Sequence, residues 1–462
     1  MRFLKEEYLT VFIVDEVSYW KSVEKEYNYL TDLVLTYDFS LYKYIENIGG
    51  DVNFIDSLVD PTKMHSHNNI LYKFIKNWYL DSHGKDIFVY KNIPFGFSFK
   101  LDVWNDIVYY TRLHLCLREL KTIKFEDIII SSKDKVLASV LDKLSLTYRL
   151  NKCPVVTKSA YFFPIFKYMD DRIRAKGLRG LLYKIREVGS SIFGRMTPFI
   201  DKLTYRNTNK TVFIQEYHPT KEILARLRDS NNINVLLANF SRKTTFRNNL
   251  AERIIPIYGN ASKFEGIGEE LLALFFLKKH ATLVFDNGFD ITDELFQIIY
   301  LKVRNAISEK LRVLDCSISY IDNNNVSLEI LIANIGQVST LFDCVCKIRG
   351  IPSYLIINGL LGPEYDDEAK NATYINSYST NIRDTYFLGM SNVVTLGDPR
   401  MDMYGPHIKY KKINRVEPVV VIGASGFNSV DLNSYVSVEF DFMFDVLTAL
   451  QELNNTGVTL SI

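Results

Sequence analysis

The chain has little cysteine and little tryptophan for its length. Its 462 residues include five cysteines and three tryptophans, against 29 tyrosines and 30 phenylalanines. The cysteine count is odd, and the spacing matches no zinc or redox motif. Cys344 and Cys346 fall in a predicted helix, where residues two apart point away from each other. The sequence therefore predicts buried, reduced thiols and a reducing compartment, the cytoplasm.

An excess of charge of one sign is also missing, as are long apolar runs. The 55 Lys and Arg against 54 Asp and Glu give a formal net charge of +1, so global electrostatics favours no nucleic-acid partner. Residues 1–7 are charged and lack the apolar core of a signal peptide. No run approaches the roughly 20 apolar residues that span a bilayer. We expect a protein that is soluble or lies on a membrane surface.

Metal-ligand patterns are missing too. His65 and His67, with His83 beyond, superficially suggest a metal site. No acidic residue is spaced as a further ligand, and 61–69 reads as a polar loop. The sequence predicts no metal and no cofactor.

Short apolar runs alternate with helical patterns, an order typical of α/β proteins with parallel sheets. We expect a first Rossmann-type unit over 1–150 and a second over 211–404. The strands expected in the first are 10–14, 32–36, 52–55 and 127–131, with helices 101–120 and 134–144. The strands expected in the second are 212–215, 234–238, 282–285, 327–335, 353–357, 372–376 and 392–396. Helices are expected there at 221–229, 293–311, 337–350 and 381–390.

The segment 151–210 reads as a basic amphipathic helical connector. Within it, 161–186 combines an aromatic patch with basic residues interleaved with Ile and Leu. Such a helix can lie on an anionic membrane, at about 1 kcal/mol per basic residue near the surface. The alternative is a solvated linker helix that packs its Leu face on the fold.

A third unit begins after a polar linker at 405–418. In 419–462 we expect a strand at 419–422, a glycine loop and a helix at 439–453. A single strand-helix-strand buries too little apolar surface to stand alone. The sequence therefore predicts an incomplete C-terminal domain, or last elements that pack onto an earlier domain.

Carboxylates and one histidine at predicted strand ends are the candidate catalytic groups. Glu216 and His218 follow the strand 212–215 and can both face a cleft as general base or acid. Their alternative role is to cap the following helix. Asp286 follows 282–285 as a candidate nucleophile or base, although Asx-turn chemistry explains the same residue without function.

A set of motifs between Asn334 and Asp402 resembles a known family. Gly350-Ile351-Pro352-Ser353, Asn358-Gly359, Ser377-Tyr378-Ser379 and the loop 397–402 follow in order. This order resembles the end of the acceptor-side domain in GT-B glycosyltransferases that build bacterial surface polysaccharides. It is similar to CDP-glycerol glycerophosphotransferases and capsule-type Kdo transferases. Several of these relatives carry His-Gly where this chain has Asn358-Gly359, and asparagine takes no proton at neutral pH.

The resemblance implies a GT-B-like fold and a cleft that binds both substrates. Substrate-binding candidates are Asn358, Gly359, Arg400 and Asp402, and Glu364 is a further candidate catalytic residue. We expect Asn358 and Arg400 to follow adjacent parallel strands and to share one crevice. Arg400 could hold a phosphate or carboxylate, or pair with Asp402 and brace the linker.

The third unit would then be the start of the donor-nucleotide-binding domain. Its donor-binding candidates are the loop residues Gly423, Ser425, Gly426 and Asn428. Backbone N–H groups there could hold a phosphate. The loop lacks G-x-G-x-x-G and the P-loop lysine, so a plain turn explains it equally well.

The implied activity is metal-independent transfer of a sugar from a CMP-, CDP- or UDP-activated donor to a surface polysaccharide acceptor, such as a lipid-linked glycan. The enzyme would be cytoplasmic, with peripheral contact to the inner face of the cell membrane through 161–186. The alternatives are a polyol-phosphate transferase of the CDP-glycerol type, a nucleotide-sugar 2-epimerase, and a non-catalytic binding module with a degraded or truncated donor domain.

Overall fold

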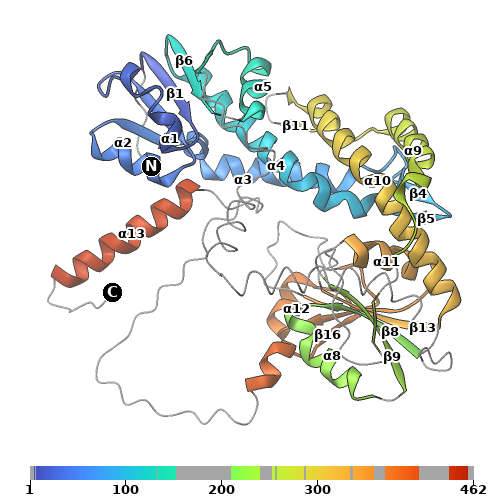
Figure 1. Cartoon of the computed structure of the whole chain (residues 1–462). Coiled ribbons are helices and arrows are strands. Elements are labelled where there is room, and N and C mark those ends of the chain that lie inside the picture. The colour runs from blue at the N-terminus through green and yellow to red at the C-terminus, as the bar shows by residue number, and fades with distance from the viewer. Residues whose placement is uncertain are drawn as a thin grey trace, which may run out of the picture.

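The protein is built around two separate parallel β-sheets, one in each half of the chain (Figure 1). The computed structural model describes residues 5, 7–132, 134–151, 210–230, 232–239, 252–254, 257–285, 288–332, 337–357, 370–404 and 436–455. The expected linker at 405–418 lies outside these ranges. So does the expected connector at 151–210, except for its first and last residues.

The N-terminal sheet has five parallel strands in the order β3-β2-β1-β6-β7. Their bounds are β1 Thr10–Val14, β2 Leu33–Thr36, β3 Asp51–Phe54, β6 Asp127–Ser131 and β7 Arg149–Leu150. One face is covered by α1 (Val17–Trp20) and α2 (Phe39–Asn47), where Trp20 and Tyr42 pack with Phe12. The central strands are buried on both faces, as their uninterrupted apolar runs predict.

The C-terminal sheet has seven parallel strands in the order β10-β9-β8-β13-β14-β15-β16. Their bounds are β8 Lys210–Glu216, β9 Ile233–Asn239, β10 Glu252–Ile254, β13 Val326–Ile332, β14 Ser353–Ile356, β15 Tyr374–Ser377 and β16 Val393–Thr395. Leu224 of α8 (Lys221–Arg228) packs on one face, and α11 (Gln337–Ile348) covers the other, where Phe342 stacks on Phe213 at 4.3 Å. The expected α/β fold with tandem Rossmann-type sheets is confirmed.

A layer of helices lies between the two sheets (Figure 1). It contains α3 (Pro61–Asn77), α4 (Lys100–Arg118), α9 (Glu265–Lys278) and α10 (Thr292–Asn323). One buried apolar cluster runs from Val11 of the N-terminal sheet through these helices to Phe213 of the C-terminal sheet. The ammonium of Lys310, on α10, is buried and lies 2.8 Å from an Asp102 carboxylate oxygen at the start of α4. The layer therefore joins the two halves through a common core.

Two expectations about elements were wrong, and one expected helix is confirmed but extends further than predicted. The expected strand at 282–285 belongs to neither sheet, because β11 (Val284–Phe285) pairs antiparallel with β12 (Phe289–Asp290) across a turn at Gly288, whose φ is 72°. The expected helix at 293–311 continues to Asn323 as α10. The expected polar loop at 61–69 is the first half of α3, which Asp60 caps by accepting a hydrogen bond from the Thr62 N–H.

The last described element, α13 (Val436–Asn455), packs its first turns on the N-terminal unit. The ring of Phe440 lies 5.0 Å from that of Tyr42 and 5.5 Å from that of Phe54. The helix itself was expected, whereas the strand and glycine loop expected before it lie outside the described residues. Among the helices of the described ranges, none combines the length and apolar character that crossing a membrane requires.

Candidate functional site

The strand order of the C-terminal sheet reverses between β8 and β13. From β8 the chain proceeds to β9 and β10 on one side, and from β13 to β14, β15 and β16 on the other. In open parallel sheets, ligands bind outside the carboxyl ends of the strands at such a switch point. Glu216 is the last residue of β8 and stands at this position.

The Glu216 carboxylate has one oxygen atom without a hydrogen-bond partner among the described residues. The residue is half-buried, and its Oε2 atom is buried without a hydrogen-bond partner among the described residues. Buried carboxylate oxygens in proteins are nearly always hydrogen-bonded, so an exception requires an explanation.

His218 follows two residues later and is exposed. Its ring lies 5.2 Å from that of Tyr217, at the start of the 3₁₀ helix η5 (His218–Thr220). The turn is held by Thr220, whose hydroxyl accepts from the Tyr217 N–H at 3.0 Å and donates to the Gln215 carbonyl at 2.6 Å. The capping role weighed for Glu216 and His218 therefore falls to Thr220.

Arg400 also lies near Glu216, in the segment that follows β16, the edge strand of the sheet. It lies in the 3₁₀ helix η8 (Pro399–Tyr404), which packs against η5 and α8. Its guanidinium lies 5.7 Å from the centre of the Tyr378 ring, which follows β15. Burial raises the pKa of Tyr378, and the nearby Asp398 carboxylate adds to the effect. The structure thus brings together two predicted loops, those of Glu216 and Arg400.

Asp398 holds Arg400 in place. The Arg400 Nη2 lies 2.6 Å from the Asp398 Oδ2, and its Nε donates to the Oδ1 at 2.9 Å. Burial alone would raise the pKa of Asp398, but the hydrogen bonds from Arg400 outweigh it and lower the pKa. The Asp398 carboxylate also accepts the Arg400 backbone N–H at 2.9 Å. The pairing of Arg400 with Asp402 stays a prediction, because the side chain of Asp402 lies outside the described residues.

The Asp398 loop is positioned by Asn376 at the end of β15. Its amide donates to the Gly397 carbonyl at 2.9 Å, and its carbonyl oxygen accepts the Leu396 N–H at 3.0 Å. Ser379 caps α12 (Thr380–Tyr386), where its hydroxyl accepts a hydrogen bond from the Ile382 N–H at 3.2 Å. These bonds fix the carboxyl ends of β15 and β16 relative to each other.

Most of the other predicted site residues cannot be placed in this cluster. Asn358 and Arg400 were expected to follow adjacent strands, but β15 lies between β14 and β16. The residues outside the described ranges are Asp286, Asn358, Gly359, Glu364, Gly423, Ser425, Gly426 and Asn428, together with the side chain of Asp402. Phe285, which precedes Asp286, belongs to the β11–β12 hairpin, beside α3 and α4. Among the described residues, no three His, Cys, Asp or Glu side chains gather as a metal site would require.

Sequence reasoning missed two members of the cluster, Tyr378 and Asp398. Both carried a signal, since Tyr378 follows a strand in the Ser377-Tyr378-Ser379 turn and Asp398 opens the loop of Arg400. Aromatic and acidic residues in loops at the carboxyl edge of a parallel sheet favour ligand contact.

Comparison with known proteins identifies no family for this chain. No family model and no curated protein matches the chain. Among solved structures, a similarity is found to SsfS6, a glycosyltransferase of Streptomyces sp. SF2575, with 8% sequence identity over 79% of this chain and 85% of that one. The TM-score is 0.16, so this similarity carries no argument about function.

Proposed function

We propose that this protein is a glycosyltransferase that moves a sugar from a nucleotide-activated donor to a glycan or glycolipid acceptor. The observation that carries the proposal is the Glu216 carboxylate at the switch point of the C-terminal sheet, with a buried oxygen that accepts no hydrogen bond among the described residues. The tandem parallel sheets and the resemblance of the motifs between Asn334 and Asp402 support the same activity.

In the proposed reaction Glu216 acts as the general base. It takes the proton of the acceptor hydroxyl while that oxygen attacks the anomeric carbon of the donor sugar. The bond between the anomeric carbon and the phosphate oxygen breaks, and the nucleotide leaves with the bonding electrons. His218, two residues away and exposed, is placed to carry the proton onward to solvent.

Arg400 is the proposed contact for the donor phosphate. Its side chain remains 39% exposed although it pairs with Asp398, so an anion can reach it. The ion pair with Asp398 and the contact with the Tyr378 ring hold the Arg400 guanidinium in one orientation. This reduces the conformational entropy that is lost when a ligand binds. The hypothesis has three further parts. They are membrane contact through 161–186, donor binding by the loop at 423–428, and a cytoplasmic location facing the membrane.

The test combines nucleotide binding with turnover. Calorimetry with CMP, CDP and UDP would identify the donor base, and release of that nucleotide in the presence of lipid-linked glycans would report transfer. We expect Glu216→Gln to lower turnover about 10²- to 10⁴-fold, the usual contribution of a general base, with little change in nucleotide affinity. Glu222→Gln is the matched control, because Glu222 is exposed on α8 of the same unit.

Full turnover by Glu216→Gln, or no binding of any nucleotide, would contradict the proposal. Consumption of CDP-glycerol with release of CMP would instead indicate polyol-phosphate transfer. Conversion of a UDP-sugar without any acceptor would indicate a 2-epimerase.

A further inference from the structure

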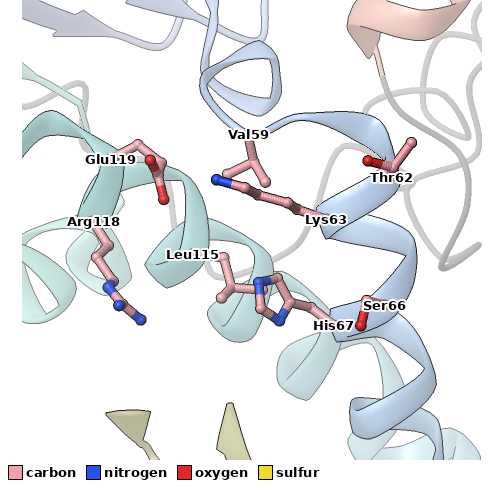
Figure 2. A pocket seen from close by; sticks show the side chains of 8 residues that line it. All are labelled: Val59, Thr62, Lys63, Ser66, His67, Leu115, Arg118 and Glu119. Carbon is pink, nitrogen blue, oxygen red and sulfur yellow. The ribbon is translucent and has the colours of Figure 1, made fainter. Parts of the chain in front are cut away.

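A cavity of about 340 Å³ opens between α3 and α4, in the helical layer (Figure 2). None of the residues assigned to sugar transfer lines it. Its lining residues are Val59, Thr62, Lys63, Ser66, His67, Leu115, Arg118 and Glu119. In Figure 2, Lys63 extends from α3 toward the end of α4, where Arg118 and Glu119 lie. The cavity volume is at the lower end of the range for small-molecule sites.

Two of the polar side chains that line the cavity, His67 and Arg118, contact aromatic rings of the β11–β12 hairpin. The ring of Phe285 meets that of His67 edge-on at 4.9 Å, and the Arg118 guanidinium lies 4.8 Å from the centre of the Phe289 ring. A guanidinium over an aromatic ring keeps its N–H edges available for hydrogen bonds. The site is therefore partly preorganised on helices and a short hairpin.

The charges in the cavity favour an anion. Among the lining residues, Lys63 and Arg118 supply two cations against the single carboxylate of Glu119, and the Asp60 carboxylate at the start of α3 interacts with Lys63 from outside the lining. Within the described part of the chain, neither Lys63 nor Arg118 forms an ion pair with a carboxylate. An anion that lies between Lys63 and Arg118 is attracted by both cations.

We propose that this cavity binds a small phosphate ester with a hydroxyl-bearing carbon body. A tetrahedral dianion accepts hydrogen bonds from Arg118 and Lys63 together, which are among the strongest that proteins make. Val59 and Leu115 supply apolar surface for the carbon body, and the Glu119 carboxylate accepts hydrogen bonds from hydroxyl groups. A sugar phosphate satisfies all three requirements, whereas inorganic phosphate satisfies only the first.

Calorimetry on the full chain with ribose 5-phosphate, glycerol 3-phosphate, inorganic phosphate and ribose tests the proposal. We expect ribose 5-phosphate to bind most tightly and ribose not to bind. Lys63→Ala and Arg118→Gln should each weaken ribose 5-phosphate at least about tenfold, the loss of one charge-assisted hydrogen bond. Lys73→Ala is the matched control, because Lys73 carries the same charge on α3 and is exposed but does not line the cavity.

Several results would overturn the inference. These are no heat of binding with either ester, equal weakening by Lys73→Ala, or binding of ribose as tight as that of its phosphate. Arg118 also packs on Phe289, so thermal midpoints should accompany each variant, and Lys63, which is exposed, gives a second variant that keeps the fold. Glu216→Gln should leave the binding of ribose 5-phosphate unchanged. The results for this proposal and for the transferase proposal are therefore independent of each other.

Discussion

The two sheets share one topology but differ at their switch points. In the N-terminal sheet the order reverses between β1 and β6, next to Asp15, Ser131 and Ser132. There the Ser132 hydroxyl donates to the Asp15 Oδ2 at 2.8 Å, and the Ser131 hydroxyl donates to the Tyr19 carbonyl at 3.0 Å. In the C-terminal sheet the equivalent position holds Glu216, with a buried oxygen that no described residue satisfies.

The two switch points therefore differ in whether their polar groups have hydrogen-bond partners. Polar groups that satisfy one another stabilise a fold and gain nothing from a ligand, whereas an unsatisfied buried group costs free energy until a ligand binds. Strand order alone makes the two switch points equivalent, and their hydrogen bonds distinguish them. The catalytic role proposed for Glu216 therefore concerns the C-terminal sheet, whereas the polar groups named at the switch point of the N-terminal sheet already have hydrogen-bond partners.

The two halves should also respond to pH in opposite directions, and the larger effect belongs to the N-terminal half. His114 is fully buried on α4, 4.5 Å from the ring of Phe289. Burial lowers its pKa from 6.5 to about 4. The unfolded chain therefore takes up a proton below pH 6.5 that the folded chain refuses, and stability falls as the pH drops from 6.5 toward 4.

Over that window we expect a loss of about 3 kcal/mol, from 1.36 kcal/mol per pKa unit. Urea unfolding between pH 4 and 8 would measure it. His114→Leu, close to histidine in volume, should remove most of this acid dependence, whereas the exposed His280→Leu should keep it. Equal acid dependence in all three proteins would show that His114 is not the group responsible.

The switch points themselves should differ in stability by a smaller amount. Ser132→Ala removes a hydrogen bond to Asp15 and should lower the free energy of unfolding by about 1 kcal/mol. Glu216→Met replaces an unsatisfied carboxylate with an apolar side chain of similar length. It should leave stability unchanged or raise it, as is common when a functional residue is removed.

Urea midpoints of the two variants measured side by side provide the test. If Glu216→Met is the more destabilised of the two, Glu216 is a structural residue and the comparison between the switch points fails.

Much of the fold could be predicted because buried parallel strands are continuous apolar runs. The expected strands at 10–14 and 127–131 match β1 and β6 in full, and Glu216 lies at the edge where it was expected. The second half of α10 was missed although Val313, Leu314, Ile318 and Ile321 continue its buried face at helical spacing. The polar first turns of α3 concealed a helix that Asp60 and Pro61 signalled.

The contacts inside the site were less predictable. Asp398 and Asp402 are both two residues from Arg400, so sequence spacing does not choose between them. In the structure the Asp398 carboxylate contacts both the backbone and the side chain of Arg400, a double contact that sequence spacing does not predict. The α3–α4 cavity depends on tertiary packing of the β11–β12 hairpin, for which the sequence carries no local signal.

The smallest expected effect concerns a buried carboxyl in the C-terminal half. Glu329 lies on β13 with no exposed surface and faces α11, where Asp343 pairs with Lys347 at 2.7 Å. Burial, and then the charge of Asp343, raise the pKa of Glu329 well above its ordinary 4.5. The folded protein therefore keeps a proton that the unfolded chain loses above pH 4.5, and stability declines as the pH rises toward the raised pKa.

Glu329→Gln keeps the shape of the protonated side chain and cannot ionise, so it should match the parent protein at pH 4.5. At pH 8 it should be more stable, by up to about 1 kcal/mol, the size of an ordinary single substitution. Urea midpoints at the two pH values would measure the difference, with the exposed Glu270→Gln of α9 as control. A gain at pH 4.5 that is as large as the gain at pH 8 would mean that packing, not the proton, separates the two proteins. Only the acid response of His114 would then remain, and the two halves would not respond to pH in opposite directions.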